Sequence, residues 1–223
     1  MSITKSENIS NTHFQRAEEL LPTYGDNQDN ADITADSAPP GDESITDNSD
    51  ASHEAVTCVV GGKNLTPQQL AMVSVEYQSD EQPGTLIIHT GECAAYYLLG
   101  NGKAVRIRVA VGKEGFGWEG VAYVHEKRVD PTWTPPSEMI ARRPELAKWA
   151  GGMPGGLPEN PLGTRAMYLY DENGNDTMYR IHGTAEPLSI GHRASSGCIR
   201  VYPGQIEQLF DHMPVGTKVI VTS

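Results

Sequence analysis

Cysteine, basic residues and long apolar runs are all scarce in this sequence of 223 residues. Three cysteines are too few, and odd in number, for the disulfide framework of a small secreted scaffold. No run reaches the roughly 18 apolar residues that a membrane-spanning helix needs. No secretory signal peptide is visible either, because no basic region followed by an apolar stretch opens the sequence. The sequence therefore leaves three alternatives for the compartment. The protein stays in the cytoplasm, or it is exported by another route, or the given sequence begins after a removed signal.

The shortage of basic residues is concentrated in one part of the chain. The formal net charge is −12, which argues against nucleic acid or an anionic membrane as the main partner. Residues 1–55 contain 12 acidic and two basic residues, whereas residues 56–223 contain 17 and 15. Residues 27–53 hold hardly any large apolar side chain, so burial cannot offset the entropy of ordering them. We expect residues 1–55 to form a mostly disordered acidic leader, followed by a transitional segment over 56–83.

The pattern from residue 84 to residue 223 indicates a folded domain rich in short strands. Gly100-Asn101-Gly102 separates two apolar runs and predicts a hairpin turn, because these residues tolerate positive φ. A helix is expected over 137–150 with a break at Pro144, and another after Pro203, where apolar residues recur at helical spacing. The expected strands cover 85–90, 94–99, 103–111, 121–129, 165–170, 177–182 and 218–222. This order lacks βαβ alternation and predicts a mainly β fold with one or two packed helices.

The three cysteines occupy different settings. Cys58 and Cys93 lie among strand or loop residues, and we interpret them as small buried side chains or as a mutual disulfide. Cys198 instead follows Gly197 and lies 16 residues after His182. A cysteine nucleophile needs a base, a small neighbour that lets substrate approach, and amide donors for the developing oxyanion. Gly197 and His182 meet the first two needs, so Cys198 is the candidate nucleophile.

Two other interpretations of these residues remain open on composition alone. A single cysteine and a single histidine within twenty residues are more often packing residues than a catalytic pair. A metal site built from His182, His192 and Cys198 has weak support, because closely paired ligand spacing is absent. We therefore expect neither a metal nor another cofactor.

A family resemblance narrows these choices. Ile181-His182-Gly183-Thr184, a loop through Ser195, and then Ser196-Gly197-Cys198-Ile199-Arg200 resemble the signature of the L,D-transpeptidase catalytic domain, the YkuD-type family. The resemblance covers about residues 84–223. It departs from the family pattern at Ser196, where many members carry His. Further landmarks resembling the family, in order, are Gly84-Thr85-Leu86-Ile87-Ile88, Val111-Gly112-Lys113, Gly117-Trp118-Glu119-Gly120, Pro131-Thr132-Trp133, Asn160-Pro161-Leu162-Gly163 and Pro214-Val215-Gly216-Thr217.

The resemblance implies a β-sandwich or barrel-like catalytic domain that acts on peptidoglycan stem peptides. It implies that Cys198 attacks the bond after the third stem residue, releases D-Ala, holds the acyl group as a thioester and passes it to an amine acceptor. His182 would be the general base. The family pattern also implies that Gly183 orients the imidazole through its carbonyl. The main-chain N–H groups of Gly197 and Cys198 are the expected oxyanion donors, and the Ser196 hydroxyl can donate there too. Arg200 and Arg193 suit the free carboxylates of a stem peptide, with surface solvation or a local backbone contact as the alternative.

The function implied by the resemblance has two alternatives. Water in place of the amine would make the protein an L,D-carboxypeptidase for wall turnover or recycling, and an inert Cys198 would leave a non-catalytic wall-binding module. The expected partners are donor and acceptor stem peptides. The expected compartment is the periplasm or cell envelope, with the cytoplasm as the alternative because no signal peptide is visible. Trp118, Trp133 and Trp149 could line the substrate groove or belong to the core.

Overall fold

The structure is a computed structural model that describes residues 56–61 and 63–223. The expected acidic leader over residues 1–55 lies outside the described residues. The described part is mainly β, as the sequence predicts. Its strands are β1 (Val73–Glu76), β2 (Leu86–His89), β3 (Ala94–Gly100), β4 (Lys103–Gly112), β5 (Gly120–Val129), β6 (Arg165–Tyr170), β7 (Asp176–His182), β8 (Arg193–Ser195), β9 (Ile199–Val201) and β10 (Lys218–Thr222).

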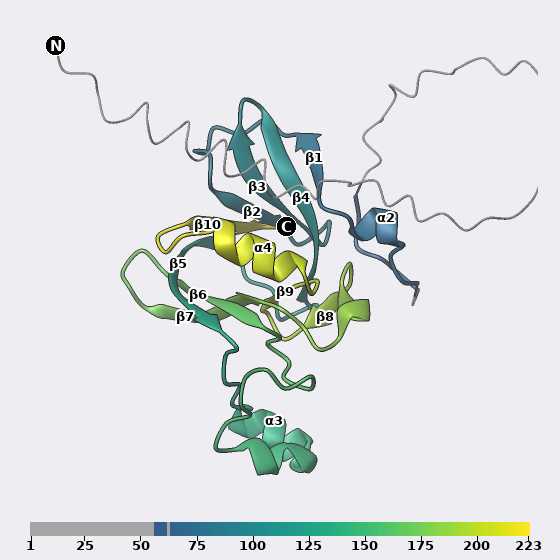
Figure 1. Cartoon of the computed structure of the whole chain (residues 1–223), viewed down its shortest axis with the longest axis vertical. Coiled ribbons are helices and arrows are strands. Elements are labelled where there is room, and N and C mark those ends of the chain that lie inside the picture. Colours follow the sequence, from purple (N-terminus) through teal and green to yellow (C-terminus); the bar gives the residue numbers. More distant parts are fainter. Residues whose placement is uncertain (1–55, 62) are drawn as a thin grey trace, which may run out of the picture. The chain divides into compact units, whose positions relative to one another are not determined.

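Eight of these strands close into a barrel (Figure 1). They pair in the order β4-β3-β2-β10-β5-β6-β7-β9, and β9 pairs again with β4, which completes the ring. Strand β1 adds to β4 outside the ring, and β8 runs parallel to the last residues of β4. Closure satisfies the strand edges with main-chain hydrogen bonds and makes the wall of the barrel a rigid support.

The expected hairpin, strands and strand-rich pattern are confirmed, and the structure adds three short strands. β3 and β4 are joined at Gly100 and Asn101-Gly102, where φ is positive. The strands β1, β8 and β9 are only three or four residues long, too short for a periodic apolar pattern to identify them. They form because β4, which is ten residues long, offers hydrogen-bonding partners along both edges. The segment over 56–83 thus contains β1 and the short helix α2 (Pro67–Leu70).

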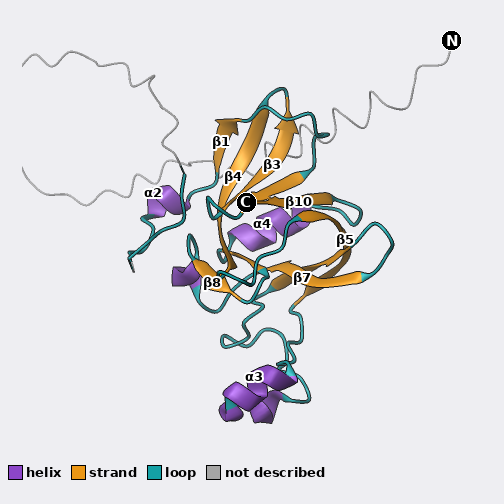
Figure 2. Ribbon diagram, turned by 180° about the vertical axis from the view of Figure 1, so that it is seen from behind, coloured by secondary structure: helices purple, strands orange, loops and turns teal. Residues whose placement is uncertain are grey.

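The last helix, α4 (Gln205–His212), packs against the barrel core with the apolar stripe that the sequence predicts. Ile206 and Leu209 are fully buried in the core cluster, and Phe210 and Met213 join them. The helix begins at Gln205 and not at Pro203, because Gly204 has φ +87° and precedes the first helical residue. Figure 2 shows α4 lying across the strands. Among the described residues, no helix combines the length and apolar character required to cross a bilayer.

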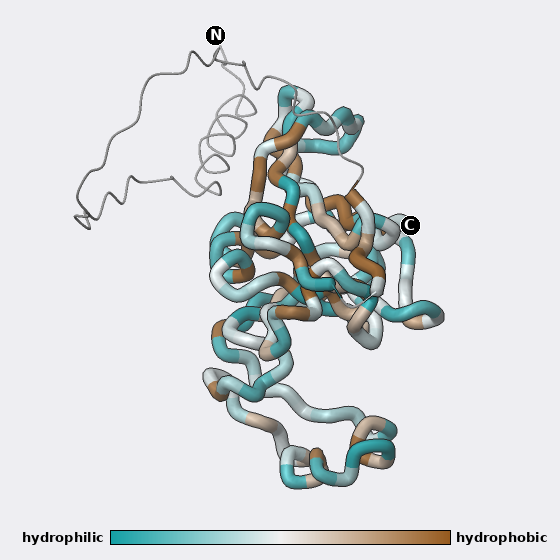
Figure 3. Tube along the Cα trace, turned by 90° about the vertical axis from the view of Figure 1, so that its right-hand side faces the viewer, coloured by the Kyte–Doolittle hydropathy of each residue, from teal (hydrophilic) through white to brown (hydrophobic). Residues whose placement is uncertain are grey.

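Residues 130–164, here called the cap, extend from the ends of β5 and β6 (Figure 1). They contain α3 (Ser137–Arg142) and the 3-10 helix η1 (Pro144–Trp149), so the predicted helix is interrupted at Pro144 as expected. A main-chain hydrogen bond of 2.8 Å from Asp130 to Thr164 closes the base of the cap. Figure 3 shows mostly polar or neutral residues along the cap, whereas hydrophobic segments follow the barrel strands.

The buried side chain of Asn160 organises the return of the cap. Its amide nitrogen donates to the carbonyls of Pro131 at 2.9 Å and Pro154 at 3.1 Å. Its amide oxygen accepts from the N–H of Leu162 at 2.9 Å. Asn160 is 0% exposed, and these bonds replace the regular ladder that a loop lacks. One amide thus ties three separate points of the cap together.

Cys58 and Cys93 form a disulfide, which decides between the two interpretations of these residues. The bridge holds the segment 56–61 against the barrel. Within that segment, Val59 donates a main-chain hydrogen bond to the carbonyl of Gly191 at 2.8 Å. Arg108 of β4 donates to the carbonyl of Thr57 at 2.7 Å. The disulfide therefore joins the first described residues to the barrel and to the loop that leads into β8.

Candidate active site

His182 and Cys198 lie on neighbouring strands of the barrel wall. His182 is the last residue of β7, and Cys198 immediately precedes β9. The two strands run parallel, with Ile181 opposite Ile199 and His182 opposite Arg200. Ile181 and Ile199 are buried in the core cluster, so the alternation of a strand directs His182 and Cys198 to the outer face of the barrel. The fold thus brings together the two residues that the sequence separates by 16 positions.

The imidazole of His182 is held in one orientation and one tautomer. Its Nδ1 lies 2.6 Å from the carbonyl oxygen of Gly183, and because a carbonyl only accepts, Nδ1 carries the hydrogen. Nε2 is left free to accept a proton. Burial lowers the pKa of His182 to about 4, with the Gly183 carbonyl opposing that shift and the charges of Arg200 and Arg180 adding to it. His182 is therefore neutral near pH 7 and has the protonation state of a general base.

Cys198 is the free cysteine of the described residues and is partly exposed. Burial raises the pKa of its thiol, while hydrogen bonding from the main chain of Arg180 and the charges of Arg180 and Arg200 lower it. At neutral pH the resting site thus pairs a thiol with a neutral imidazole. No hydrogen bond joins the two side chains among those of the described residues. Such contacts commonly tighten only when substrate binds.

Gly197 allows the turn that presents Cys198. Its φ of +117° lies in the region that favours glycine, and a Cβ there would lie 2.7 Å from the Tyr179 ring and 3.0 Å from the carbonyl oxygen of Phe116. The Ser195 hydroxyl completes the turn, donating to the carbonyl of Cys198 at 2.5 Å and accepting from the N–H of Gly197 at 3.1 Å. Any larger residue at position 197 would displace the nucleophile or its neighbours.

The expected oxyanion donors differ in availability. The N–H of Gly197 already donates to Ser195, whereas Ser196 is exposed beside it. The N–H of Cys198 donates in none of the hydrogen bonds found in the described part of the chain. The main-chain N–H of Cys198 and the Ser196 hydroxyl are therefore the groups free to meet a developing oxyanion in this conformation.

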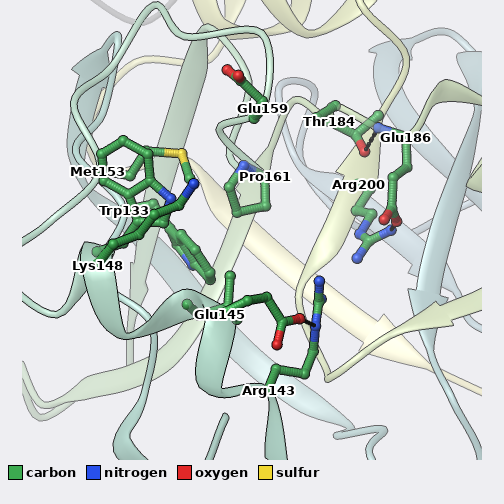
Figure 4. Close-up of a pocket in the computed structure, with 13 residues that line it drawn as sticks. Trp133, Arg143, Glu145, Lys148, Met153, Glu159, Pro161, Thr184, Glu186 and Arg200 are labelled. Carbon is green, nitrogen blue, oxygen red and sulfur yellow. Dashed lines mark hydrogen bonds and ion pairs between the residues drawn. The ribbon is translucent and has the colours of Figure 1, made fainter. Parts of the chain in front are cut away.

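A cavity of about 290 Å³ lies between the cap and the barrel residues that follow His182 (Figure 4). Figure 4 shows Arg200, Glu186 and Thr184 on one side of it and Trp133 and Lys148 on the other. His182 and Cys198 do not line this cavity, but Thr184 follows His182 by two residues and Arg200 follows Cys198 by two. The lining residues are Trp133, Arg143, Glu145, Leu146, Lys148, Trp149, Met153, Glu159, Pro161, Thr184, Ala185, Glu186 and Arg200.

The three tryptophans divide between the two interpretations made from sequence. Trp133 and Trp149 line the cavity. Trp118 instead packs against the core cluster and stacks on Tyr179, with ring centroids 4.8 Å apart. The Tyr179 ring in turn lies 2.7 Å from the position that a Cβ on Gly197 would occupy. Trp118 therefore supports the wall behind the Cys198 turn.

The two arginines expected to bind substrate carboxylates occupy different places. Arg200 lines the cavity and pairs with Glu186, with 2.6 Å between the guanidinium and carboxylate atoms. It also lies 3.3 Å from the hydroxyl of Ser189. Arg193 is exposed on β8 and is not among the cavity residues. The structure thus assembles Cys198, His182 and Arg200, and leaves Arg193 apart.

The described residues contain no group of three or more His, Cys, Asp or Glu side chains that could hold a metal ion. Sequence reasoning missed Arg180, which lies on the same face of β7 as His182 and whose main chain and charge both lower the pKa of Cys198. The period of two along a strand could have found it, since it precedes His182 by two residues. It also missed Glu186, whose partner Arg200 is 14 residues away in sequence, and it had Asn160 only as part of a family landmark, without the hydrogen bonds that tie the cap.

Comparisons with known proteins identify the family of this chain. The family model of the L,D-transpeptidase catalytic domain, YkuD, matches residues 83–221. The chain is 34% identical over 167 residues to the probable L,D-transpeptidase ErfK/SrfK of Escherichia coli, covering 71% of this chain and 48% of that protein. The chain spans about half the length of the curated relatives it matches.

Two solved structures are also similar. A probable carnitine operon oxidoreductase from Brucella melitensis is 39% identical, with a TM-score of 0.47, covering 68% of this chain and 92% of that one. An Enterococcus faecium L,D-transpeptidase, a C442S mutant, is 19% identical, with a TM-score of 0.47, covering 63% of this chain and 50% of that one. The two names are those of the similar proteins and not of this chain. The family match over more than half of the chain establishes that this protein belongs to the L,D-transpeptidase catalytic-domain family.

Proposed function

We propose that this protein is a peptidoglycan L,D-transpeptidase that forms a thioester between Cys198 and the third residue of a donor stem peptide. The observation that carries the proposal is the neutral, buried imidazole of His182, whose Nδ1–H is bound to Gly183 and which shares one face of the β7–β9 pair with Cys198. This arrangement pairs a thiol with a base that can accept its proton. A backbone carbonyl here orients the imidazole, the task of the buried Asp in a serine-protease triad.

Acylation begins when Nε2 of His182 takes the thiol proton and Sγ of Cys198 attacks the carbonyl carbon of the third stem residue. The carbonyl oxygen becomes an oxyanion that the N–H of Cys198 and the hydroxyl of Ser196 stabilise. The C–N bond then breaks, and His182 returns its proton to the departing D-Ala amine. The product is a thioester on Cys198, with a neutral imidazole beside it.

Transfer to the acceptor repeats these steps in reverse. His182 takes a proton from the attacking amine, whose nitrogen forms the new amide bond as the C–S bond breaks. The thiolate then recovers a proton from His182, and the cross-linked product leaves. Water can replace the amine in the same position, which would give the L,D-carboxypeptidase alternative. The acceptor that reaches the thioester therefore decides between the two activities.

The cavity beside the pair is the proposed donor site. A stem peptide carries free carboxylates, and Arg200 can present its planar donors to one of them. Glu186 holds Arg200 in the meantime and is 72% exposed in its side chain, so a substrate carboxylate can exchange with it. Trp133 and Trp149 supply apolar contact on the opposite side. Arg193 is left out of this donor site because it lies outside the cavity.

The disulfide bears on the compartment. Bonds such as Cys58–Cys93 form and persist in oxidising surroundings, and are rare where thiols are kept reduced. We therefore propose the cell envelope as the site of action, which is also where peptidoglycan is accessible. This placement favours the transpeptidase over a cytoplasmic recycling enzyme.

Incubation with a disaccharide-tetrapeptide followed by mass spectrometry tests the proposal. Cross-linking yields a dimer lighter by one D-Ala, whereas hydrolysis yields a tripeptide and would establish the carboxypeptidase instead. Cys198→Ala should abolish either product, with a loss of at least about 10³-fold. A carbapenem should acylate wild-type Cys198 and leave Cys198→Ala unmodified. Turnover that survives in Cys198→Ala would overturn the mechanism, and binding to sacculi without turnover or adduct would identify a non-catalytic module.

A further inference from the structure

Gly191, at the end of the loop that leads into β8, is held between two other parts of the chain. Its N–H donates to the carbonyl of Val109 in β4 at 3.0 Å, and its carbonyl accepts from the N–H of Val59 at 2.8 Å. A Cβ on Gly191 would lie 2.7 Å from the side chain of Leu65 and 3.2 Å from that of Val59, at a φ of +86° that favours glycine. Gly191 is therefore clamped between the barrel and the segment 56–61.

The Cys58–Cys93 disulfide closes these contacts into a ring. The carbonyl of Cys93 accepts a main-chain hydrogen bond of 2.9 Å from Val109. Val109 in turn accepts from Gly191, and Gly191 accepts from Val59. Cys58 immediately precedes Val59, so its bridge to Cys93 completes a ring of three main-chain hydrogen bonds and one disulfide. The disulfide thus fixes Val59, the outer partner of Gly191, against the barrel.

A compact turn connects Gly191 to the arginine of the donor site. The turn is the 3-10 helix η2 (Pro187–Ser189), which ends two residues before Gly191. Ser189 donates to the carbonyl of Glu186 from its N–H, at 2.9 Å, and from its hydroxyl, at 2.6 Å. Arg200 donates to the Glu186 carboxylate at 2.6 Å and to the Ser189 hydroxyl at 3.3 Å, and its side chain is only 18% exposed (Figure 4). Both groups that hold Arg200 therefore belong to a turn that ends at the clamped glycine.

A buried side chain limits how far this turn can move. Ile190, between Ser189 and Gly191, is 2% exposed, so the loop keeps an apolar anchor whether or not the ring is closed. Opening the ring should shift or loosen the turn without unfolding it. A small shift matters at a guanidinium, because its paired hydrogen bonds to a carboxylate depend on orientation. The expected consequence is weaker binding at Arg200 in a protein that stays folded.

Strand β8 separates this loop from Cys198. Hydrogen bonds from β4 and the residue after it fix β8, from Val111 to the carbonyl of His192 at 3.1 Å and from Lys113 to that of Ser195 at 3.0 Å. The Ser195 hydroxyl holds the turn of Cys198 by its own two bonds. These bonds are not part of the ring, so opening the ring should leave the nucleophile in place.

We propose that the Cys58–Cys93 disulfide positions Arg200 for a donor carboxylate, acting through the clamped loop that ends at Gly191. The proposal rests on the proposed function, because that function supplies the carboxylate that Arg200 binds. The two cysteines act through Arg200, so they are positioning residues and not catalytic ones. Loss of the bridge should therefore weaken binding of the donor and leave the chemistry at Cys198 nearly unchanged.

A pair of donor peptides tests this role. The first is the disaccharide-tetrapeptide with free carboxylates, and the second is the same compound with every carboxylate converted to an amide, which removes the charge that Arg200 recognises. In the double variant Cys58→Ser/Cys93→Ser, KM for the first donor should rise about five- to tenfold, with kcat within about twofold of the wild type. KM for the amidated donor should stay within about twofold, because an amide gains little from an oriented guanidinium.

The comparison of the two donors separates positioning from general damage to the fold. An equal rise of KM for both donors would overturn the proposal, as would a constant KM for the first donor or a fall in kcat with KM unchanged. Circular dichroism shows whether the double variant is folded. These results concern the bridge alone, whereas failure of the proposed function appears as absent carbapenem adduct and turnover in the wild type.

Hydrogen exchange measures the ring without any substrate. In the double variant, a peptide covering residues 185–192 should exchange at least about threefold faster than in the wild type, because the N–H of Gly191 loses the support of the closed ring. The amides of Trp133 and Met153, which bond to each other in the cap, should exchange at the wild-type rate. Unchanged exchange over 185–192 would contradict the proposal even if the wild type had no turnover.

Gly191→Ala provides a second variant if the double variant does not fold. It keeps the disulfide but places a methyl group 2.7 Å from Leu65, so the clamp must open. KM for the donor with free carboxylates should rise by a similar factor. Gly174→Ala is the matched control, because its φ of +80° imposes similar backbone strain and no described atom lies within 4 Å of the added carbon. An unchanged KM in Gly191→Ala, or an equal rise in Gly174→Ala, would overturn the proposal.

Discussion

The β7–β9 wall and the cap meet beside the candidate active site, yet they are built by different means. The wall is part of a closed barrel, with Ile181 and Ile199 buried beneath the reactive face and main-chain bonds on both sides of each strand. The cap is a long excursion of short helices and loops, with few buried residues, and Asn160 is the main internal tie. The barrel can therefore fix atoms that react, while the cap can shape the space for substrate.

This contrast makes different kinetic predictions for the two regions. Substitutions on the wall should change the rate of the chemical step, because they alter the nucleophile, the base or the field between them. Substitutions in the cap should change KM for the donor peptide and leave kcat nearly constant. Four experiments, beginning with the largest effect, test the contributions of the two regions.

Replacing the base should have the largest effect. His182→Asn removes the group that accepts the thiol proton, and we expect the rate of carbapenem acylation to fall at least about 10³-fold. A stopped-flow or mass-based acylation assay measures this. Loss of less than tenfold would show that another group takes the proton and that the wall does not carry the chemistry in the way described here.

The same residue predicts a pH dependence of stability. Since burial lowers the pKa of His182 from 6.5 to about 4, the folded protein binds fewer protons than the unfolded chain between these values. The free energy of unfolding should thus decrease as pH falls from 6.5 to 4, by on the order of 3 kcal/mol. In His182→Asn this part of the profile should be flatter. Urea unfolding at several pH values measures the difference between the two proteins.

Gly197→Ala should have the next largest effect. The added methyl group would lie 2.7 Å from Tyr179 at a residue whose φ is +117°, so the turn must shift. We expect a loss of about 2 kcal/mol in stability and slower acylation of Cys198. Gly117→Ala, in the adjoining loop, is the control, because nothing lies within 4 Å of its added atom. Equal behaviour of the two variants would contradict the steric role of Gly197.

Asn160→Ala should have the smallest effect on chemistry. It leaves the carbonyls of Pro131 and Pro154 without their buried donor, at a cost of about 1–3 kcal/mol. We expect KM for a tetrapeptide donor to rise about three- to tenfold while kcat stays within about twofold. Asn173→Ala, in the exposed turn between β6 and β7, should change neither. A large loss of kcat with constant KM would place the cap in the chemical step and remove the contrast with the wall.

Much of the fold could be predicted because local patterns and the final packing agree. The apolar stripe of α4, the turn at Asn101 and the break at Pro144 each express a preference of the residues present. The short strands β1, β8 and β9 could not be predicted in this way. Three or four residues carry too little periodicity, and these strands exist because β4 provides neighbours for them.

The residues of the candidate site also differ in whether the sequence alone could reveal them. Cys198 and His182 are recognisable because their chemistry and the motif around them are continuous in sequence. The role of Arg193 stays a prediction, and its place on β8 puts it outside the cavity. Arg180 was overlooked although it lies two residues before His182, because its nearness to Cys198 depends on the pairing of β7 with β9.

The amino-acid sequence by itself determined the residue types able to do acyl transfer, the strand-rich domain over residues 84–223 and the glycine that opens the approach to Cys198. Only the tertiary structure decided that β7 and β9 run side by side in one register, that Cys58 pairs with Cys93, and that the cap leaves a cavity next to Arg200. The physical reason is that the chemical type of a side chain and its neighbours in sequence are local properties. Strand register, burial and the electric field at a side chain depend on partners distant in sequence. A thiol and an imidazole become a reactive pair only when those partners place them.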